Sequence, residues 1–367
     1  MDLLYKPDWE ESKKRFQAVW DAEMLDRCCV LAAAPNGKRS SIKQRPEPVT
    51  QEELERYYFD ETWIMERNVA RMEQTYFGGD AFPCIWTYFG TGGHAKYISS
   101  KLTYQPNTIW IHPVIEDYKT FKFDFDIETN AAFQKELKIL KFLAREGMGK
   151  YMVSVPDNTS CFDALAQLRG NEELLMDLYD DPEAVTEAIA RLNDVLVQTS
   201  DAILEALREN CDGGSSLGWL DTWAPGKMMQ LQCDASVMLS SEMFKKFIVP
   251  EFHKTTQTLT HPFYHLDGQE QIRHLDDILA TPNLGMIQWT QVSGQPPATA
   301  FIPELKKIQA HKKAVIICVT KDQIEPLLSQ LSPKGLILNV MDASSKEEAD
   351  EIVRYVEKFR YTKEQLK

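Results

Sequence analysis

The stretch Ala314-Val-Ile-Ile-Cys-Val319, followed by Gly335-Leu-Ile-Leu-Asn-Val340, decides the fold class. Both runs are short, apolar throughout and rich in branched side chains, which is typical of strands buried on both faces. Buried strands of this kind, separated by helices, predict a parallel sheet that is covered on both sides. The fold class is therefore expected to be α/β.

The same alternation continues along the whole chain. Eight short apolar runs are expected as strands: 27–34, 82–89, 151–155, 228–233, 263–266, 284–289, 314–319 and 335–340. Eight strand and helix units favour a (β/α)8 TIM barrel, a single domain over residues 1–367, with an N-terminal helical extension. The alternative is a doubly wound open sheet, but no glycine-rich nucleotide-binding motif follows an early strand.

Capping patterns mark several helix starts. Thr50 with Glu53 and Ser344 with Glu347 are capping-box patterns. Asp181-Pro182 combines an N-cap residue with a proline of the first turn, ahead of a long amphipathic helix. The stretch from Gly90 to about Asp126 is expected to be a long, partly irregular excursion after strand two.

Composition excludes several classes of protein. The 367 residues carry a net charge of −14 and no cluster of lysines and arginines, so nucleic acid is not an expected partner. No apolar stretch approaches the roughly 18 residues that a membrane span needs. The N-terminus does not have the pattern of a signal peptide, and the seven cysteines are scattered and odd in number. A cytoplasmic location with reduced thiols is therefore expected.

In a (β/α)8 barrel the active site lies where the strands end, so the residues at the strand exits are the candidates. His265 and Asp267 lie in the segment Phe263-Tyr-His-Leu-Asp-Gly-Gln269. Two residues apart on an extended chain, they project to the same side. They can bind a metal, move a proton or hold a polar substrate. The alternative is that His265 caps the strand and Asp267 closes the turn.

Other strand exits add a carboxylate and several aromatic residues. Asp234 ends an apolar strand, where an unpartnered carboxylate is costly to bury, and it joins His265 and Asp267 as a catalytic candidate. The candidates for substrate binding are Trp86, Tyr88, Trp219, Trp223, Gln288 and Trp289. Of these, Trp219 and Trp223 lie just before the run 228–233, in the segment 218–226 that is expected to be a loop. Aromatic walls suit a planar ring or a quaternary ammonium group. Ordinary packing explains any one of these aromatic residues equally well. Asp157, Cys318 and Asn339 also lie at exits, Asp157 as a turn former and Cys318 as core.

Three segments resemble the uroporphyrinogen decarboxylase superfamily, which includes corrinoid methyltransferases and is distantly related to cobalamin-independent methionine synthase. They are Phe162-Asp-Ala-Leu-Ala-Gln-Leu-Arg-Gly170, the block Asp234 to Pro250 (DASVMLSSEMFKKFIVP), and His265 to Leu279. The chain is similar to a divergent member of the methyltransferase group. The resemblance implies a (β/α)8 barrel and a homodimer.

The resemblance also implies a metal site. The zinc methyltransferases of this group use His-x-Cys at the fifth strand and a cysteine near the eighth. Here His265 matches the histidine, Asp267 replaces the first cysteine, and Asp342 lies near the position of the second. The implied ligands are His265, Asp267 and Asp342, a set that suits zinc or a harder ion such as manganese. The arginine-rich motif of the decarboxylases is absent from Ala34-Pro-Asn-Gly-Lys-Arg-Ser40.

Three functions follow. The first is a methyltransferase-like enzyme that acts on a small methylated compound. A corrinoid, if it takes part, would come on a separate partner protein, because no cobalamin-binding Asp-x-His-x-x-Gly signature occurs. The second is a metal-free decarboxylase or lyase in which His265 and Asp234 act as acid and base. The third is a non-catalytic barrel that binds a small molecule.

Overall fold

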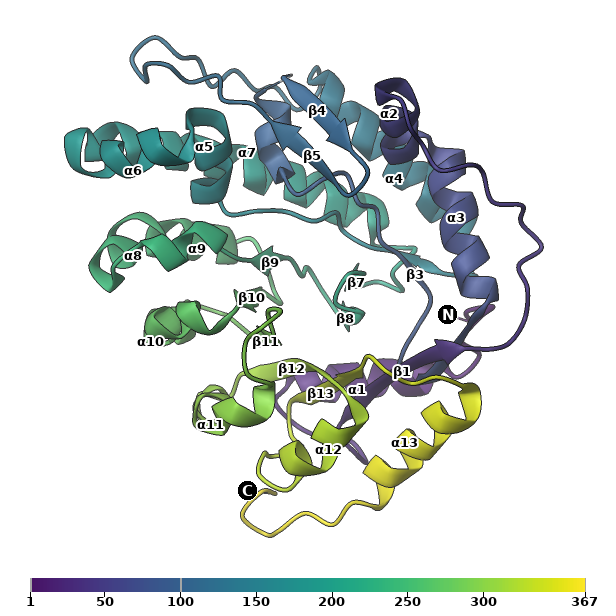
Figure 1. Ribbon diagram of the computed structural model, residues 1–367. Coiled ribbons are helices and arrows are strands. Elements are labelled where there is room, and N and C mark those ends of the chain that lie inside the picture. Colours follow the sequence, from purple (N-terminus) through teal and green to yellow (C-terminus); the bar gives the residue numbers. More distant parts are fainter. Residues whose placement is uncertain (1, 100, 367) are drawn as a thin grey trace.

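The computed structural model describes residues 2–99 and 101–366. Each of the eight predicted runs overlaps a strand, which confirms the alternating pattern. The strands are β1 (Cys29–Pro35), β3 (Cys84–Ile85), β6 (Met152–Val153), β9 (Gln230–Leu231), β10 (Phe263–Asp267), β11 (Met286–Thr290), β12 (Ala314–Val319) and β13 (Leu336–Val340). Figure 1 shows these strands around a common centre, with helices on the outside.

Most of the strands belong to one largely parallel sheet. Its order is β2-β1-β13-β12-β11-β10-β9, in which only β2 (Thr75–Gly79) runs antiparallel to its neighbour. Strands β3 and β6 form a separate parallel pair. The α/β class with a parallel sheet is thus confirmed. Closure into a complete eight-stranded barrel stays a prediction, since no ladder among the described residues joins the pair to the larger sheet.

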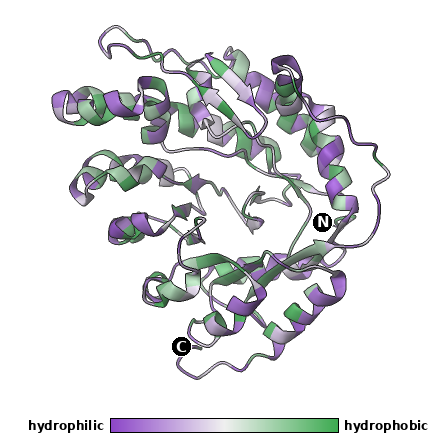
Figure 2. Cartoon of the chain, in the orientation of Figure 1, coloured by the Kyte–Doolittle hydropathy of each residue, from purple (hydrophilic) through white to green (hydrophobic). Residues whose placement is uncertain are grey.

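The helices follow the strands along the chain. Their bounds are α1 (Trp9–Trp20), α2 (Gln51–Phe59), α3 (Glu61–Glu73), α4 (Ala131–Gly147), α5 (Cys161–Arg169), α6 (Asn171–Asp180), α7 (Pro182–Leu207), α8 (Ser241–Phe247), α9 (Val249–Thr256), α10 (Leu275–Leu279), α11 (Ile302–Ala310), α12 (Lys321–Leu328) and α13 (Lys346–Lys358). Figure 2 shows hydrophobic residues gathered on the central strands and hydrophilic residues more frequent on the outer helices. None of the described helices has both the length and the apolar character needed to span a bilayer.

Two predicted capping boxes have different outcomes. Thr50 accepts from the backbone N–H of Glu53 at 3.2 Å, and Glu53 accepts from that of Thr50 at 3.0 Å, so this box is confirmed. The second capping box lies one residue later than expected. Ser345, not Ser344, accepts from the backbone N–H of Glu348 at 3.2 Å. The hydroxyl of Ser344 instead donates to the Glu348 carboxylate at 2.6 Å.

Strand β2 was not expected from the sequence, because its two glycines read as the end of a helix. They are needed for the close approach of β2 to β1. A Cβ atom at Gly79 would lie 2.3 Å from the carbonyl oxygen of Val30, and one at Gly78 would lie 2.7 Å from that of Ala32. The expected excursion contains a hairpin of β4 (Leu102–Gln105) and β5 (Thr108–Ile111).

Asp80, directly after β2, ties the amino-terminal end of the sheet together. Its carboxylate is fully buried and accepts from Arg27 Nη1 at 2.5 Å, from Arg15 Nη1 at 3.1 Å and from the backbone N–H of Val30 at 3.0 Å. One carboxylate thus joins α1, β1 and the end of β2. In (β/α)8 folds the catalytic face lies at the carboxyl ends of the strands, and this network lies at the opposite ends. We therefore expect the network to contribute to stability and not to catalysis.

We expect Asp80→Asn to lower the free energy of unfolding by about 3–5 kcal/mol, because it removes the nearest and fully buried countercharge of the Arg27 guanidinium. Urea unfolding followed by circular dichroism measures the change. Asp276→Asn is the matched control, since its exposed pair with Lys307 should contribute little. Equal midpoints for the two variants would contradict this role of Asp80.

Candidate active site

The pairing of β10 with β11 decides which side chains face the centre of the fold. His265 lies opposite Gln288, and Asp267 lies opposite Thr290. The residues between them, Leu266 and Trp289, are buried on the other face of the sheet. Since strand side chains alternate between faces, His265 and Asp267 project together from the carboxyl end of β10, as expected.

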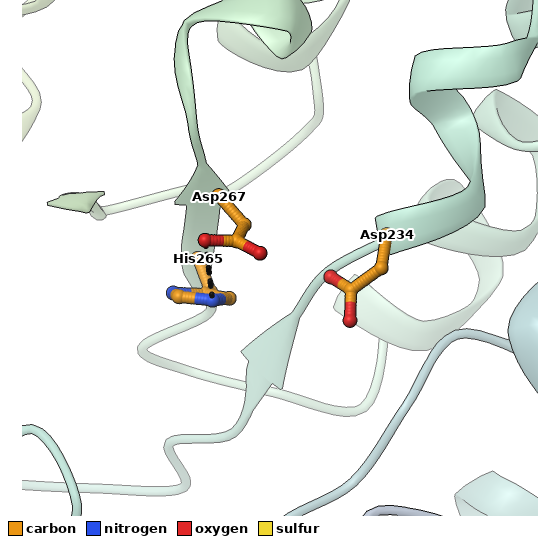
Figure 3. A group of neighbouring side chains, drawn as sticks. All are labelled: Asp234, His265 and Asp267. Carbon is orange, nitrogen blue, oxygen red and sulfur yellow. Dashed lines mark ion pairs between the residues drawn. The ribbon is translucent and has the colours of Figure 1, made fainter. Parts of the chain in front are cut away.

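Asp234 reaches the same place from the end of β9, where the 3-10 helix η2 (Asp234–Met238) begins. Ligand atoms of Asp234, His265 and Asp267 all lie within 4.8 Å of one another. Figure 3 shows the three side chains converging from the two strand ends. His265 Nε2 lies 3.9 Å from Asp267 Oδ1. The structure thus brings together the three residues predicted as catalytic.

Asp163, near the start of α5, holds the backbone that carries Asp234. Its carboxylate accepts from the backbone N–H of Asp234 at 3.0 Å and of Ala235 at 2.9 Å. The Thr159 hydroxyl donates to it at 3.1 Å. Asp163 is therefore a positioning residue. The sequence offered one signal for it, its place in the segment resembling the decarboxylase superfamily, but no role followed from that.

The hydrogen bonds of His265 Nδ1 determine which ring nitrogen carries the proton. Nδ1 makes a short hydrogen bond with the amide oxygen of Gln288 and lies 3.2 Å from the hydroxyl of Thr290. The same Thr290 hydroxyl donates to Gln288 Oε1 at 2.7 Å. An amide oxygen only accepts, so Nδ1 carries the proton and Nε2 presents its lone pair toward Asp267 and Asp234. Burial lowers the pKa of His265, which favours the neutral ring.

Two carboxyl groups at the strand ends, Asp234 and Asp157, hold protons more tightly than usual. Desolvation and the charges of Asp163, Asp267 and Asp157 raise the pKa of Asp234 to about 7. Burial raises the pKa of Asp157 to about 7 as well. Asp234 is itself exposed to solvent. The negative charges of its neighbours are therefore the better explanation for its raised pKa. A cluster that gathers negative charge in this way favours a bound cation.

A hairpin occupies the centre of the fold beside these residues. Strand β8 (Thr222–Ala224) lies in the segment 218–226 that was expected to be a loop. It pairs with β7 (Ser215–Leu217), and the two strands lie in the middle of Figure 1. A Cβ atom at Gly218 would lie 2.9 Å from Ser154 Cβ, so the tip presses against the strand pair. On the other side the Trp219 ring lies 4.7 Å from the His265 ring, edge to face. The hairpin thus contacts β10 as well as β6.

The aromatic candidates separate into two groups. Trp219 lies against His265, and Trp86 and Tyr88 contact each other at 5.0 Å near the hairpin tip. The indole N–H groups of Trp86 and Trp219 are buried without a partner. Trp223 and Trp289 are core residues instead. Trp223 donates to the carbonyl oxygen of Cys211 at 2.8 Å, and Trp289 packs on Phe301 at 5.1 Å.

Asp342 does not join the three clustered residues, in contrast to its expected place among the metal ligands. Its Oδ1 accepts from the backbone N–H of Lys321 at 3.0 Å, at the start of α12. Two further polar residues belong to this region. Asp157, expected to be a turn former, accepts from Gln230 Nε2 at 2.8 Å. Gln230 was not predicted, because it lies inside an apolar run.

Comparisons with known proteins give a likeness of fold alone. The chain matches no protein-family model and no curated protein sequence. It is similar to a solved structure, a methyltransferase from Methanosarcina mazei, with a TM-score of 0.62 and 11% sequence identity. The match covers 94% of this chain and 98% of that chain. The α/β architecture therefore agrees with that of a known methyltransferase over nearly its full length.

Glu251 on α9 supports the start of α5 and so the position of Asp163. It is buried and accepts from the backbone N–H of Cys161 at 2.6 Å. Burial, and then the charge of Asp163, raise the pKa of Glu251 from an ordinary 4.5 to about 8. The folded protein therefore binds this proton more tightly than the unfolded chain does. The resulting stability is complete below pH 4.5 and is lost as the pH rises through 8.

We expect the free energy of unfolding to fall more steeply between pH 6 and pH 8 in the unmodified protein than in Glu251→Gln, which cannot ionise. The difference in slope should be up to about 1 kcal/mol per pH unit. Urea unfolding at a series of pH values measures both slopes. Parallel curves for the two proteins would mean that Glu251 is already ionised across this range.

Proposed function

We propose that this chain is a methyltransferase-like enzyme that acts on a small methylated compound and works through a metal centre at Asp234, His265 and Asp267. The observation that carries the proposal is the convergence of one imidazole and two carboxylates within 4.8 Å at the carboxyl ends of β9 and β10. The full-length likeness of fold to a solved methyltransferase supports the reaction class.

The donor set fits a divalent ion. His265 Nε2 is unprotonated, because Nδ1 donates to Gln288, and metal-binding histidines commonly donate their second N–H in this way. Asp267 and Asp234 supply carboxylate oxygens. Three protein ligands leave a coordination position open for substrate, as in catalytic zinc sites. A divalent ion bound here would act as a Lewis acid on the atom that carries the methyl group.

The surrounding residues orient the substrate. Trp219, edge to face with His265, forms an apolar wall beside the metal ligands. Trp86 and Tyr88 extend that wall near the hairpin tip. The methyl acceptor or donor, a corrinoid, would be carried on a separate partner protein and would approach from the face where the strands end.

A second candidate is a metal-free decarboxylase or lyase. The raised pKa of Asp234, about 7, favours it, because a carboxyl group that holds its proton near neutral pH can act as a general acid. Neutral His265 would then serve as the base. The two candidates differ in their need for metal, so the binding of metal separates them.

We expect metal-free protein, prepared with a chelator and dialysed, to bind one equivalent of zinc or manganese by isothermal titration calorimetry. His265→Ala should weaken this binding about 100-fold or more, because it removes the one nitrogen ligand. Its melting temperature without metal should change little. Asp342→Ala, the control, should bind as the unmodified protein does. Absence of binding in the unmodified protein favours the metal-free candidate.

We expect Gln288→Leu to weaken metal binding about 10–100-fold, because the imidazole loses the acceptor that fixes its tautomer and orientation. All three metal ligands remain in this variant. Calorimetry with zinc measures the affinity, and Gln198→Leu on the exposed side of α7 is the matched control. Unchanged affinity would mean that Gln288 does not orient His265.

A further inference from the structure

A cavity of about 120 Å³ lies on the outer side of the fold, between the segment 42–48 and the helices α2 and α3. Figure 1 shows the chain from β1 to α2 running along the outer side of α3, away from β9 and β10. None of the described residues that line this cavity belongs to the candidate active site. A ligand bound in the cavity would therefore be distinct from the substrate of that site.

Arg67, on α3, brings a positive charge into this cavity without a carboxylate to balance it. Its side chain is half-buried, and its Nη1 donates a hydrogen bond to the carbonyl oxygen of Tyr57. Among the residues that the structure describes, Arg67 has no other hydrogen bond and no ion pair, so its remaining N–H groups lack an acceptor. Burial lowers the pKa of Arg67, and the groups that oppose this effect are Tyr57 and Tyr58, not an acidic residue.

Other arginines of this protein are balanced by carboxylates. The hydrogen bond from Arg169 to Asp177 raises the pKa of Arg169, and the hydrogen bond from Arg45 to Glu66 raises the pKa of Arg45. Removing a charge from water costs free energy unless a partner of opposite charge compensates for it. The unbalanced guanidinium of Arg67 therefore indicates that the cavity is built for an anion.

Aromatic rings hold the two guanidinium groups of the cavity in place. Arg67 lies 4.0 Å from the centroid of the Tyr57 ring, and Arg45 lies 5.2 Å from that of the Trp63 ring. The two rings contact each other edge to face at 5.6 Å, which joins α2 to α3. Each ring face attracts the cation above it. The N–H groups of Arg67 are thus positioned before an anion binds, which favours binding.

The unpaired charges of the cavity match a doubly charged anion. Arg45 is already bound to Glu66 at 2.8 Å. Lys43 forms no ion pair among the described residues, so Lys43 and Arg67 contribute two positive charges. Glu47 also lines the cavity, but it is exposed and its charge is screened by solvent. A phosphate group carries close to two negative charges near neutral pH, whereas a carboxylate carries one.

We propose that this cavity binds a phosphate group, which comes either as inorganic phosphate or on a small phosphate monoester. Arg67 would donate paired hydrogen bonds to two phosphate oxygens, as guanidinium groups do, and Lys43 would supply the second positive charge. The inference goes beyond the proposed function and does not depend on it, because none of the three candidate metal ligands takes part.

Isothermal titration calorimetry of the metal-free protein with inorganic phosphate tests the binding directly. Chelation first removes any ion at Asp234, His265 and Asp267 that could itself bind phosphate. We expect one equivalent to bind with a Kd of about 1 mM or lower, and sodium chloride at equal ionic strength to give no saturable heat. Phenyl phosphate is the second ligand. Tighter binding of phenyl phosphate assigns the site to a monoester, and equal affinity assigns it to inorganic phosphate.

Two variants make the test specific. Arg67→Gln should weaken phosphate binding about 10–100-fold, because hydrogen bonds from a charged donor are lost. Lys43→Gln should weaken it about 3-fold or more, because one positive charge is lost. Arg208→Gln, which removes the same charge from an exposed pair with Glu205, is the control and should bind as the unmodified protein does. Melting curves check folding, and if Arg67→Gln does not fold, Lys43→Gln decides.

The inference is overturned if neither phosphate ligand gives saturable binding, or if Arg67→Gln or Lys43→Gln binds phosphate as tightly as the unmodified protein. Benzoate serves as the carboxylate analogue of phenyl phosphate. Equal affinity for benzoate and phenyl phosphate would show that the cavity selects a single negative charge, which would contradict the assignment to phosphate.

Discussion

The register of β10 between β9 and β11 is the constraint on which the candidate active site depends. It sets His265 beside Gln288 and Asp267 beside Thr290, and on the other side it pairs Phe263 with Gln230 and Tyr264 with Leu231. A slip of one residue would turn His265 and Asp267 outward and bring Leu266 inward, because the side-chain period of a strand is two. The buried face of Leu266 and Trp289 opposes such a slip, so apolar packing on one side holds the polar residues on the other.

The interior of the fold differs from the layers of branched aliphatic residues that usually fill a (β/α)8 barrel. Toward the strand exits its side chains are histidine, glutamine and aspartate, and the β7–β8 hairpin lies among the strands. Trp219 at the hairpin tip contacts His265, so the hairpin acts as a wall of the site as well as a filler of space. A polar interior is stable only if its groups are paired, and most of them are. The amide oxygens of Gln230 and Gln232 are among the exceptions, since each is buried without a hydrogen-bond partner.

Much of this architecture could be predicted from the sequence. Strand positions follow from apolar runs such as 314–319, and the joint projection of His265 and Asp267 follows from their spacing. Strand β2 could not be predicted, because glycine pairs mark turns more often than close strand contacts. Trp289 is a core residue and not a pocket residue, because its position at a strand exit does not reveal which face it occupies when the strand boundary is uncertain by one residue. Trp223 is a core residue because the expected loop that carries it forms a strand of the central hairpin.

The contacts between distant segments were also beyond the sequence. Asp342 falls near the position that the family resemblance implies for a ligand, but its carboxylate binds the backbone of Lys321. Asp234 takes the third place in the cluster because Asp163, from a helix far away in the chain, fixes its backbone. Such long-range hydrogen bonds leave no periodic signal, so the members of the candidate metal-binding cluster could be identified only from the fold.

The central claim is that Asp234, His265 and Asp267 hold one divalent ion. Anomalous diffraction from crystals of zinc-loaded protein, recorded on both sides of the zinc absorption edge, tests it most directly. We expect one strong peak with His265 Nε2 and an oxygen of each aspartate at about 2.0–2.2 Å. A peak elsewhere, or none at these three side chains in fully loaded protein, would contradict it.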